Sequence, residues 1–168
     1  MEDSMNNNIE LRYQKYIKPT LWEHIAHSRM AKVSLMGTIS ELEAYRYIKE
    51  RLGEEWEVVH NKDGTADFTA VNRVTGQIAE IESKRTSKNE INFQRAIRDV
   101  MEVRLYDYDF CDIICVDMSD VTGVVNDYRF INTQSLPAHK NYPNKIKPSI
   151  LVEENSITLG DAIKNLKK

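Results

Sequence analysis

The sequence contains few of the residues that crosslink a chain or interrupt it. It has 2 cysteines, 4 prolines and 6 glycines among 168 residues. Two cysteines are too few for a disulfide framework or a four-cysteine zinc site, and no stretch approaches the ~20 apolar residues that a membrane span needs. No internal repeat and no Pro/Gly-rich linker divides the chain. These absences exclude a disulfide-rich secreted fold and a membrane-spanning protein.

A surplus of positive charge is also missing. The chain carries 23 Lys+Arg against 26 Asp+Glu, a formal charge of −3. Taken as a sum, this charge argues against a nucleic-acid partner, because domains that bind nucleic acid are usually strongly basic. The charges are segregated, however: residues 84 to 104 have a balance of +3, whereas residues 105 to 127 hold six aspartates and no lysine or arginine. A local basic surface is therefore compatible with the total.

Length and composition predict one soluble domain covering residues 1–168. A chain of this length can bury most of the surface that it exposes when unfolded, without disulfide bonds or structural metal ions. Its 41% hydrophobic and 29% charged residues are typical of a globular protein. The first ten residues, MEDSMNNNIE, are acidic and polar, unlike a secretory signal. A cytoplasmic location is therefore the expectation.

A helix followed by three strands is predicted in the first half of the chain. The helix runs from Thr38 to Leu52 and ends at Gly53, a typical stop signal. Before it, residues 8 to 34 are expected to be helical. Three β-rich runs follow at residues 55–60, 66–71 and 77–84.

A second helix and a buried strand are predicted next. Residues 89 to 104 have helical period, with apolar side chains on one side, and residues 110 to 118 form a largely apolar strand. The order α-β-β-β-α-β describes a mixed α/β fold, a mixed sheet with helices on its faces. The expected parts are a helical N-terminal extension, a core and an irregular C-terminal part with strands and a final helix, at residues 1–36, 37–118 and 119–168.

Glu41 lies in the middle of an apolar helical stripe. At 100° per residue, Tyr45, Ile48 and Leu52 fall within 40° of it. A carboxylate aimed at a core is costly unless it is paired or binds a metal. A buried salt bridge and a functional carboxylate both account for this position.

The hairpin formed by residues 66–84 gathers further charges. Strand alternation places Glu80, Glu82 and Lys84 on one face. With a four-residue loop, Asp67 lies opposite Glu82, where Cβ atoms are ~5 Å apart and like charges are destabilising. A divalent cation bridging the two carboxylates would reverse that sign, and oxygen ligands suit Mg²⁺ or Mn²⁺.

A second register remains open for this hairpin. With a two-residue loop at Thr75 and Gly76, Asp67 would instead pair with Lys84. In either register Asp67, Glu82 and Lys84 share a face. A metal-free fold in which Asp67 and Lys84 form an ion pair is therefore an alternative, and it predicts no thermal shift on adding Mn²⁺.

Asp67, the Glu-Ser-Lys tripeptide at 82–84 and the upstream helical Glu41 resemble the PD-(D/E)xK nuclease superfamily. That superfamily includes many restriction endonucleases and the archaeal Holliday junction resolvases. The element order over residues 38 to 118 is similar to its shared core, although Ala66 stands where the family name expects proline. The resemblance implies a restriction-endonuclease-like αβββαβ core.

The resemblance also implies a role for each matched residue. Asp67 and Glu82 would bind Mg²⁺ through one carboxylate oxygen each, with Mn²⁺ able to substitute. Glu41 would ligate a second ion or hold a water on the metal. Lys84 would orient or deprotonate the attacking water and offset charge on the phosphate. A metal ion suits this reaction because it neutralises the anionic phosphodiester and activates water.

Four cations follow the matched strand directly. We expect these side chains to contact DNA phosphates beside the site, as positioning contacts that carry no sequence information. They are Arg85, Lys88, Arg95 and Arg98.

Two other pairs of residues have simpler interpretations. His24 and His27 have no third partner nearby in the sequence, so we expect them on a helix surface or interface. Cys111 and Cys115 lie on one face of an apolar strand and are expected to be small core residues.

The expected function is that of a Mg²⁺-dependent endonuclease that hydrolyses DNA phosphodiester bonds, of the restriction type first and of the junction or repair type second. Cutting two strands needs two active sites, so a homodimer is expected. The alternative is a non-catalytic DNA-binding or assembly subunit on the same fold. The facing carboxylates favour the enzyme over the non-catalytic subunit. In a catalytically inactive protein, like charges opposite each other would be destabilising without serving a function.

Overall fold

A computed structural model defines the fold and separates the chain into two compact units, residues 1–39 and 40–168. The expected core (37–118) and C-terminal part (119–168) fall in the second unit apart from residues 37–39. No helix in the described part of the chain has the length and apolarity to cross a bilayer. The structure describes residues 23–25, 27–61, 66–97 and 102–166.

The first described helix of the core, α3 (Arg29–Leu52), ends where the sequence predicts and begins earlier. Gly53 follows it with φ +79°, a left-handed conformation that favours glycine, and its N–H donates to the Lys49 carbonyl. The buried residues Ser40, Ala44 and Ile48 are spaced by four and therefore lie on one face. That face joins the core.

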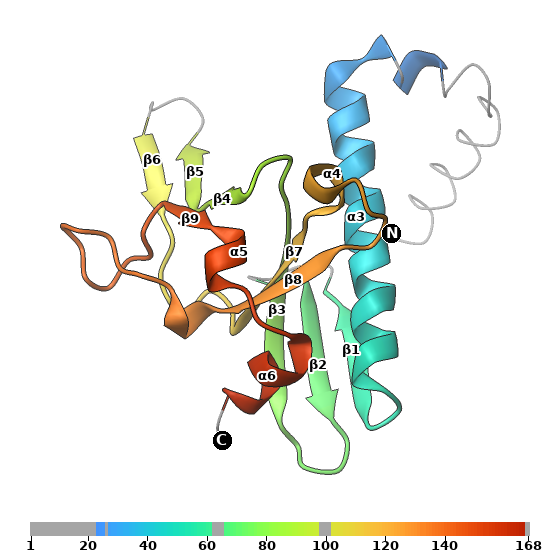
Figure 1. Cartoon of the computed structure of the whole chain (residues 1–168), viewed down its shortest axis with the longest axis vertical. Helices are drawn as coiled ribbons and strands as arrows, with labels where there is room; N and C mark the ends of the chain where they lie inside the picture. Colours follow the sequence, from blue (N-terminus) through green and yellow to red (C-terminus); the bar gives the residue numbers. More distant parts are fainter. Residues whose placement is uncertain (1–22, 26, 62–65, 98–101, 167–168) are drawn as a thin grey trace, which may run out of the picture. The chain divides into compact units, whose positions relative to one another are not determined.

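Five strands form the central sheet, in the order β1-β2-β3-β7-β8 (Figure 1). β3 and β7 are parallel, and the other neighbours are antiparallel. The prediction of a mixed α/β fold, with a mixed sheet flanked by helices, is therefore confirmed. The strands are β1 (Trp56–His60), β2 (Phe68–Asn72), β3 (Ile78–Arg85), β7 (Ile113–Asp117) and β8 (Tyr128–Asn132).

The hairpin of β2 and β3 adopts the register expected for the four-residue loop. Phe68 pairs with Ile81 and Thr69 pairs with Glu80. Continuing this register places Asp67 opposite Glu82. The turn contains Gly76 at φ +75°. The alternative with a two-residue loop is therefore wrong.

Two hydrophobic cores lie on opposite faces of β7, all of whose residues are buried. Ile113 and Cys115 pack into the core that includes Ala44 and Ile48 of α3, here called the helix-side core. Ile114 and its neighbours on the other face pack into a second, ribbon-side core. Strand alternation explains the division. Both cysteines are buried and unbridged, which confirms the prediction that they are core residues. The prediction that they share one face of a strand is wrong, because Cys111 packs into the ribbon-side core and Cys115 into the helix-side core.

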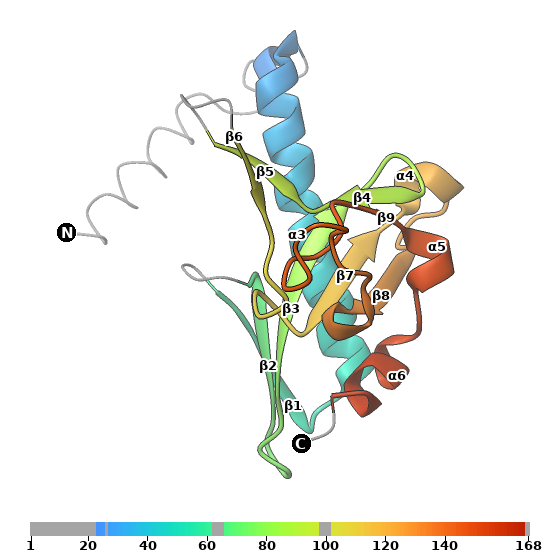
Figure 2. The same cartoon turned by 90° about the vertical axis from the view of Figure 1, so that its left-hand side faces the viewer.

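The prediction of a second helix over residues 89–104 is wrong. The described part of this segment forms short strands instead, and the β5–β6 ribbon projects away from the central sheet (Figure 2). Ile91 and Phe93 are both buried, whereas a helix would turn side chains two apart to nearly opposite sides. Packing against the ribbon-side core outweighs the helical period. The strands are β4 (Glu90–Asn92), β5 (Gln94–Ile97) and β6 (Glu102–Leu105), and β4 pairs with β9 (Ser149–Leu151).

The C-terminal part contains the predicted strands, β8 and β9, and the predicted final helix. The Thr158 hydroxyl accepts a hydrogen bond from the Asp161 N–H at 3.1 Å and so caps that helix. Leu159 and Ala162 then pack into the helix-side core. The short helical segments are α4 (Ser119–Thr122), η1 (Thr133–Ser135), α5 (Val152–Asn155) and α6 (Leu159–Lys164).

Candidate functional site

The site begins where β2 starts and β3 approaches its end. The Asp67 carboxylate, just before β2, accepts a hydrogen bond from the Ser83 N–H of β3 at 2.8 Å. On β3, Glu82 and Lys84 pair in register with Ile114 and Val116 of β7, so both project toward the ribbon-side face. The hairpin register therefore brings Asp67 beside the matched tripeptide.

Glu82 is a half-buried carboxylate with an unsatisfied oxygen. Its Oε2 is buried and has no hydrogen-bond partner among the described residues. Burial, and then the charge of Asp67, raise the pKa of Glu82 to about 7, although Lys84 and the Asp67 N–H oppose the shift. An unpaired buried oxygen next to a second acid is costly for the fold. A positive charge placed there would remove both costs.

Asp67 responds to the same surroundings. Its pKa is raised by burial, which outweighs the hydrogen bond from the Ser83 N–H, and the charge of Glu41 raises it further. His60 has the opposite effect. Asp67, Glu82 and Glu41 are therefore electrostatically coupled carboxylates.

Glu41 lies at the edge of the buried stripe of α3, not at its centre as the helical wheel predicts. The fully buried positions are Ala44 and Ile48, with Ser40 close to them, whereas the Glu41 side chain is 31% exposed. Its Oε1 is 2.8 Å from Nε2 of His60. The helical wheel placed the centre of the stripe at Glu41 because it counted Tyr45 as a core residue, but Tyr45 is only half-buried. Glu41 nevertheless lies close enough to act on Asp67.

His60 is a site residue that the sequence interpretation missed. It ends β1 and pairs in register with Phe68, the residue after Asp67. Its ring packs against Phe68, with centroids 5.2 Å apart, and stacks on Tyr45 at 6.3 Å. Pairing the run 55–60 with the run 66–71 could have found it, because that register places a histidine beside the aspartate.

Lys84 reaches the same face but forms no ion pair with Asp67. Its Nζ lies over two aromatic rings, 5.5 Å from the centroid of Phe93 and 5.2 Å from that of Tyr106. The metal-free alternative required an Asp67–Lys84 pair, and this geometry does not supply it.

A cationic hollow of about 460 Å³ continues from Lys84. Lys84, Arg85 and Lys88 line it, with Glu90 as the single carboxylate among its lining residues. Arg85 forms an ion pair with Asp120. Of the four expected DNA contacts, the structure therefore places Arg85 and Lys88 together beside the site.

The other two expected contacts are not located by the structure. Arg95 belongs to β5, but its side chain is outside the described part of the chain, and Arg98 is outside it altogether. His24 and His27 are exposed helical residues, as expected.

The residues present fit a divalent cation held by few protein ligands. Within the described ranges, no three His, Cys, Asp or Glu side chains form a complete metal-binding group. Asp67 and Glu82 offer two coupled carboxylates and one unpartnered oxygen. Mg²⁺ usually takes one or two carboxylates and keeps several waters. The donor set therefore matches Mg²⁺ better than a metal that needs an all-protein cage.

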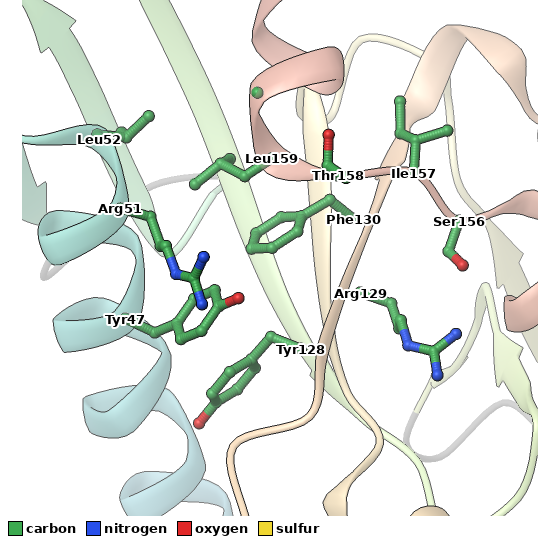
Figure 3. Close-up of a pocket in the computed structure, with 11 residues that line it drawn as sticks. Tyr47, Arg51, Leu52, Tyr128, Arg129, Phe130, Ser156, Ile157, Thr158 and Leu159 are labelled. Carbon is green, nitrogen blue, oxygen red and sulfur yellow. The ribbon is translucent and has the colours of Figure 1, made fainter.

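A separate pocket of about 540 Å³ has a different chemistry (Figure 3). Tyr47 and Arg51 of α3 face Tyr128 and Phe130 of β8 across it, whereas the Arg129 side chain points away from α3. Among the described residues that line it, the charged side chains are both arginines and none is a carboxylate. This pocket is therefore unsuited to a divalent cation.

Comparisons with solved structures include a distant likeness in fold. A bacterial homing endonuclease, I-Ssp6803I, matches 74% of this chain and 77% of its own, with 12% sequence identity and a TM-score of 0.49. No protein-family model matches the sequence, and no curated protein matches it.

Proposed function

We propose that this protein is a divalent-metal-dependent endonuclease that hydrolyses DNA phosphodiester bonds, of the restriction type first and of the junction or repair type second. The proposal rests on one observation: Glu82 presents a buried, unpartnered oxygen next to the carboxylate of Asp67. Two acids held together without a partner are costly for stability, so their retention points to a bound cation.

Each residue of the site has a task in this reaction. A bound Mg²⁺ or Mn²⁺ would activate water and neutralise the phosphate. Asp67 and Glu82 would hold the ion, and Glu41, oriented by His60, would adjust the charge beside them. Lys84 would stabilise the negative charge that grows on the phosphate in the transition state.

The cationic hollow supplies the expected DNA contact. Lys88 is exposed and Arg85 lies next to it, so both can reach a phosphate backbone. One site per subunit serves one strand, so cleavage of a duplex calls for a homodimer.

The test is plasmid and oligonucleotide cleavage by wild type, Asp67→Ala and Lys84→Ala, in Mg²⁺ and in EDTA. We expect wild type to cut only with metal, and each variant to lose about 100-fold or more, the scale for removing a preorganised charged group. Glu80→Gln is the matched control, because Glu80 lies on the same strand and its carboxylate accepts from Thr69 at 3.0 Å. It should keep its activity.

Two outcomes would contradict the proposal. Equal cleavage by all three proteins would point to a contaminant. DNA binding without metal-dependent cleavage of duplex, branched or single-stranded substrates would favour a non-catalytic DNA-binding or assembly subunit.

A further inference from the structure

Two aromatic side chains far from Lys84 in the sequence meet its ammonium group. Phe93 connects β4 to β5, and Tyr106 follows β6. Both ring centroids lie within the ~6 Å over which a cation is attracted to a ring face. The two residues flank the paired strands β5 and β6, where Gln94 pairs with Leu105, so both rings stand at the base of one ribbon. The tertiary fold brings that base to Lys84.

The rings are themselves held firmly. Phe93 is fully buried, and its N–H donates to the Pro148 carbonyl at 2.7 Å. The Tyr106 carbonyl accepts from the Ile146 N–H at 2.9 Å. The two rings meet edge to face, with centroids 6.2 Å apart. Lys84 therefore rests on a fixed aromatic surface, here called the Phe93–Tyr106 cage.

We propose that Phe93 and Tyr106 are positioning residues that hold the ammonium group of Lys84 at the site, where its positive charge serves the reaction. The proposal deepens the proposed nuclease function and rests on it. A ring face attracts the charged ammonium and has no such attraction for a neutral amine.

The charge of Lys84 also acts on the site. The lysine lowers the pKa of Glu82, so its positive charge acts on Glu82 beside Asp67. An incoming phosphate would add negative charge beside them. The cage also limits the conformations of a flexible four-carbon side chain, so the ammonium group is in place before substrate arrives.

Phe110 provides a matched control for loss of an aromatic ring. It packs against Phe93 at 6.1 Å and Tyr106 at 4.9 Å, but it is not one of the rings beneath the Lys84 ammonium. Phe110→Leu therefore removes a ring from the same cluster and leaves the cage itself complete.

The first experiment is NMR of the full chain after ¹³C-methylation of its lysines, with the Lys84 signal identified by its loss in Lys84→Arg. We expect an upfield-shifted Lys84 methyl signal in wild type and Phe110→Leu, because ring faces shield nearby protons. The shift should largely disappear in Phe93→Leu and Tyr106→Leu. An unshifted signal in wild type, or equal changes in Phe110→Leu and Tyr106→Leu, would overturn the cage.

The second experiment measures single-turnover cleavage and Mn²⁺ binding. Tyr106→Leu should slow cleavage by about 2- to 30-fold, the range expected for one cation–π contact, with unchanged Mn²⁺ affinity. Tyr106→Phe, which keeps the ring, should recover most of that rate. A loss of Mn²⁺ affinity equal to the loss of rate would overturn the positioning role, because it would place the effect on the carboxylates.

Lys84→Arg and Lys84→Gln test whether the reaction uses a positive charge held on the cage. Arginine keeps a charge that cannot act as a base and can stack on the same rings. Lys84→Arg should therefore retain much more activity than Lys84→Gln, and equal loss would overturn the cation role. If the NMR signature is present but wild type cuts no nucleic acid, the cage stands and the nuclease function fails.

Discussion

Two carboxylates on the central sheet, those of Asp117 and Glu82, differ in their hydrogen-bond partners. Asp117, at the end of β7, is only 4% exposed. Its Oδ2 accepts from the Ser40 hydroxyl at 2.7 Å, and its Oδ1 accepts from the Ser119 N–H at 3.0 Å and the Ser119 hydroxyl at 2.5 Å. Glu82 is less buried, yet its Oε2 has no partner and its neighbour is another acid.

The difference teaches that burial alone does not mark a functional carboxylate. Asp117 is surrounded by neutral donors, which satisfy it and join α3 to the end of the sheet. Glu82 has room for a donor that the chain does not provide. The missing donor, and not the depth of burial, distinguishes a candidate cation site from a structural one.

The largest expected effect is on cation binding. Asp67→Asn or Glu82→Gln should weaken Mn²⁺ binding by about 100-fold or more, at least the scale on which loss of a supporting partner weakens metal sites. Asp117→Asn should bind Mn²⁺ like wild type, because Asp117 already has its donors. Calorimetric titration of the three variants measures this. Equal weakening in Asp117→Asn would erase the distinction between the two positions.

The next effect is on the free energy of unfolding, where substitution of Asp117 should have the larger effect and substitution of Asp67 the smaller. Asp117→Ala leaves the Ser40 and Ser119 hydroxyls without their acceptor and should cost about 1–3 kcal/mol of the free energy of unfolding. Asp67→Asn in metal-free protein should cost little or be stabilising, because it removes a like charge beside Glu82. Urea unfolding in EDTA compares them. A larger loss for Asp67→Asn than for Asp117→Ala would show that the acid pair is itself structural.

The stability of the metal-free protein is also expected to depend on pH through Glu82. The pKa of Glu82 is raised from 4.5 to about 7 in the folded state, so the folded protein holds this proton more tightly than the unfolded chain. Metal-free stability should therefore fall as pH rises from about 4.5 to about 7, with no further change from this group above that window. Melting temperatures in EDTA should show the decline in wild type and a weaker one in Glu82→Gln. A matching decline in Glu82→Gln would assign the effect to other groups.

The smallest effect concerns the cationic hollow. Arg85→Gln and Lys88→Gln should each reduce the slope of log binding constant against log salt by about 1, as expected for one lost phosphate contact. Lys49→Gln is the control, because Lys49 is exposed on α3 and does not line this hollow. Unchanged slopes for Arg85→Gln and Lys88→Gln would remove both from the DNA interface.

The hairpin shows what local pattern can predict. Alternation in the run 77–84 placed Asp67, Glu82 and Lys84 on one face but left two registers open. The observed pairing of Thr69 with Glu80 selects the register that places Asp67 opposite Glu82. Residues close in sequence meet through geometry that the backbone itself sets. The type of donor, carboxylate oxygen, also follows from the residues alone.

The segment after the hairpin shows where such prediction ends. Its helical period was real, but Ile91 and Phe93 pack into the ribbon-side core, so it forms strands. His60 beside Glu41, and Ser40 on Asp117, likewise join residues from distant parts of the chain.

By itself, then, the sequence determined the chemical groups of the candidate site and the hairpin face that they share, because both are local properties. Only the tertiary structure decided which buried acid lacks a donor, which histidine adjoins Glu41, and which rings surround Lys84. Those outcomes depend on packing between segments far apart in the chain, where the energy of burial outweighs local periodicity.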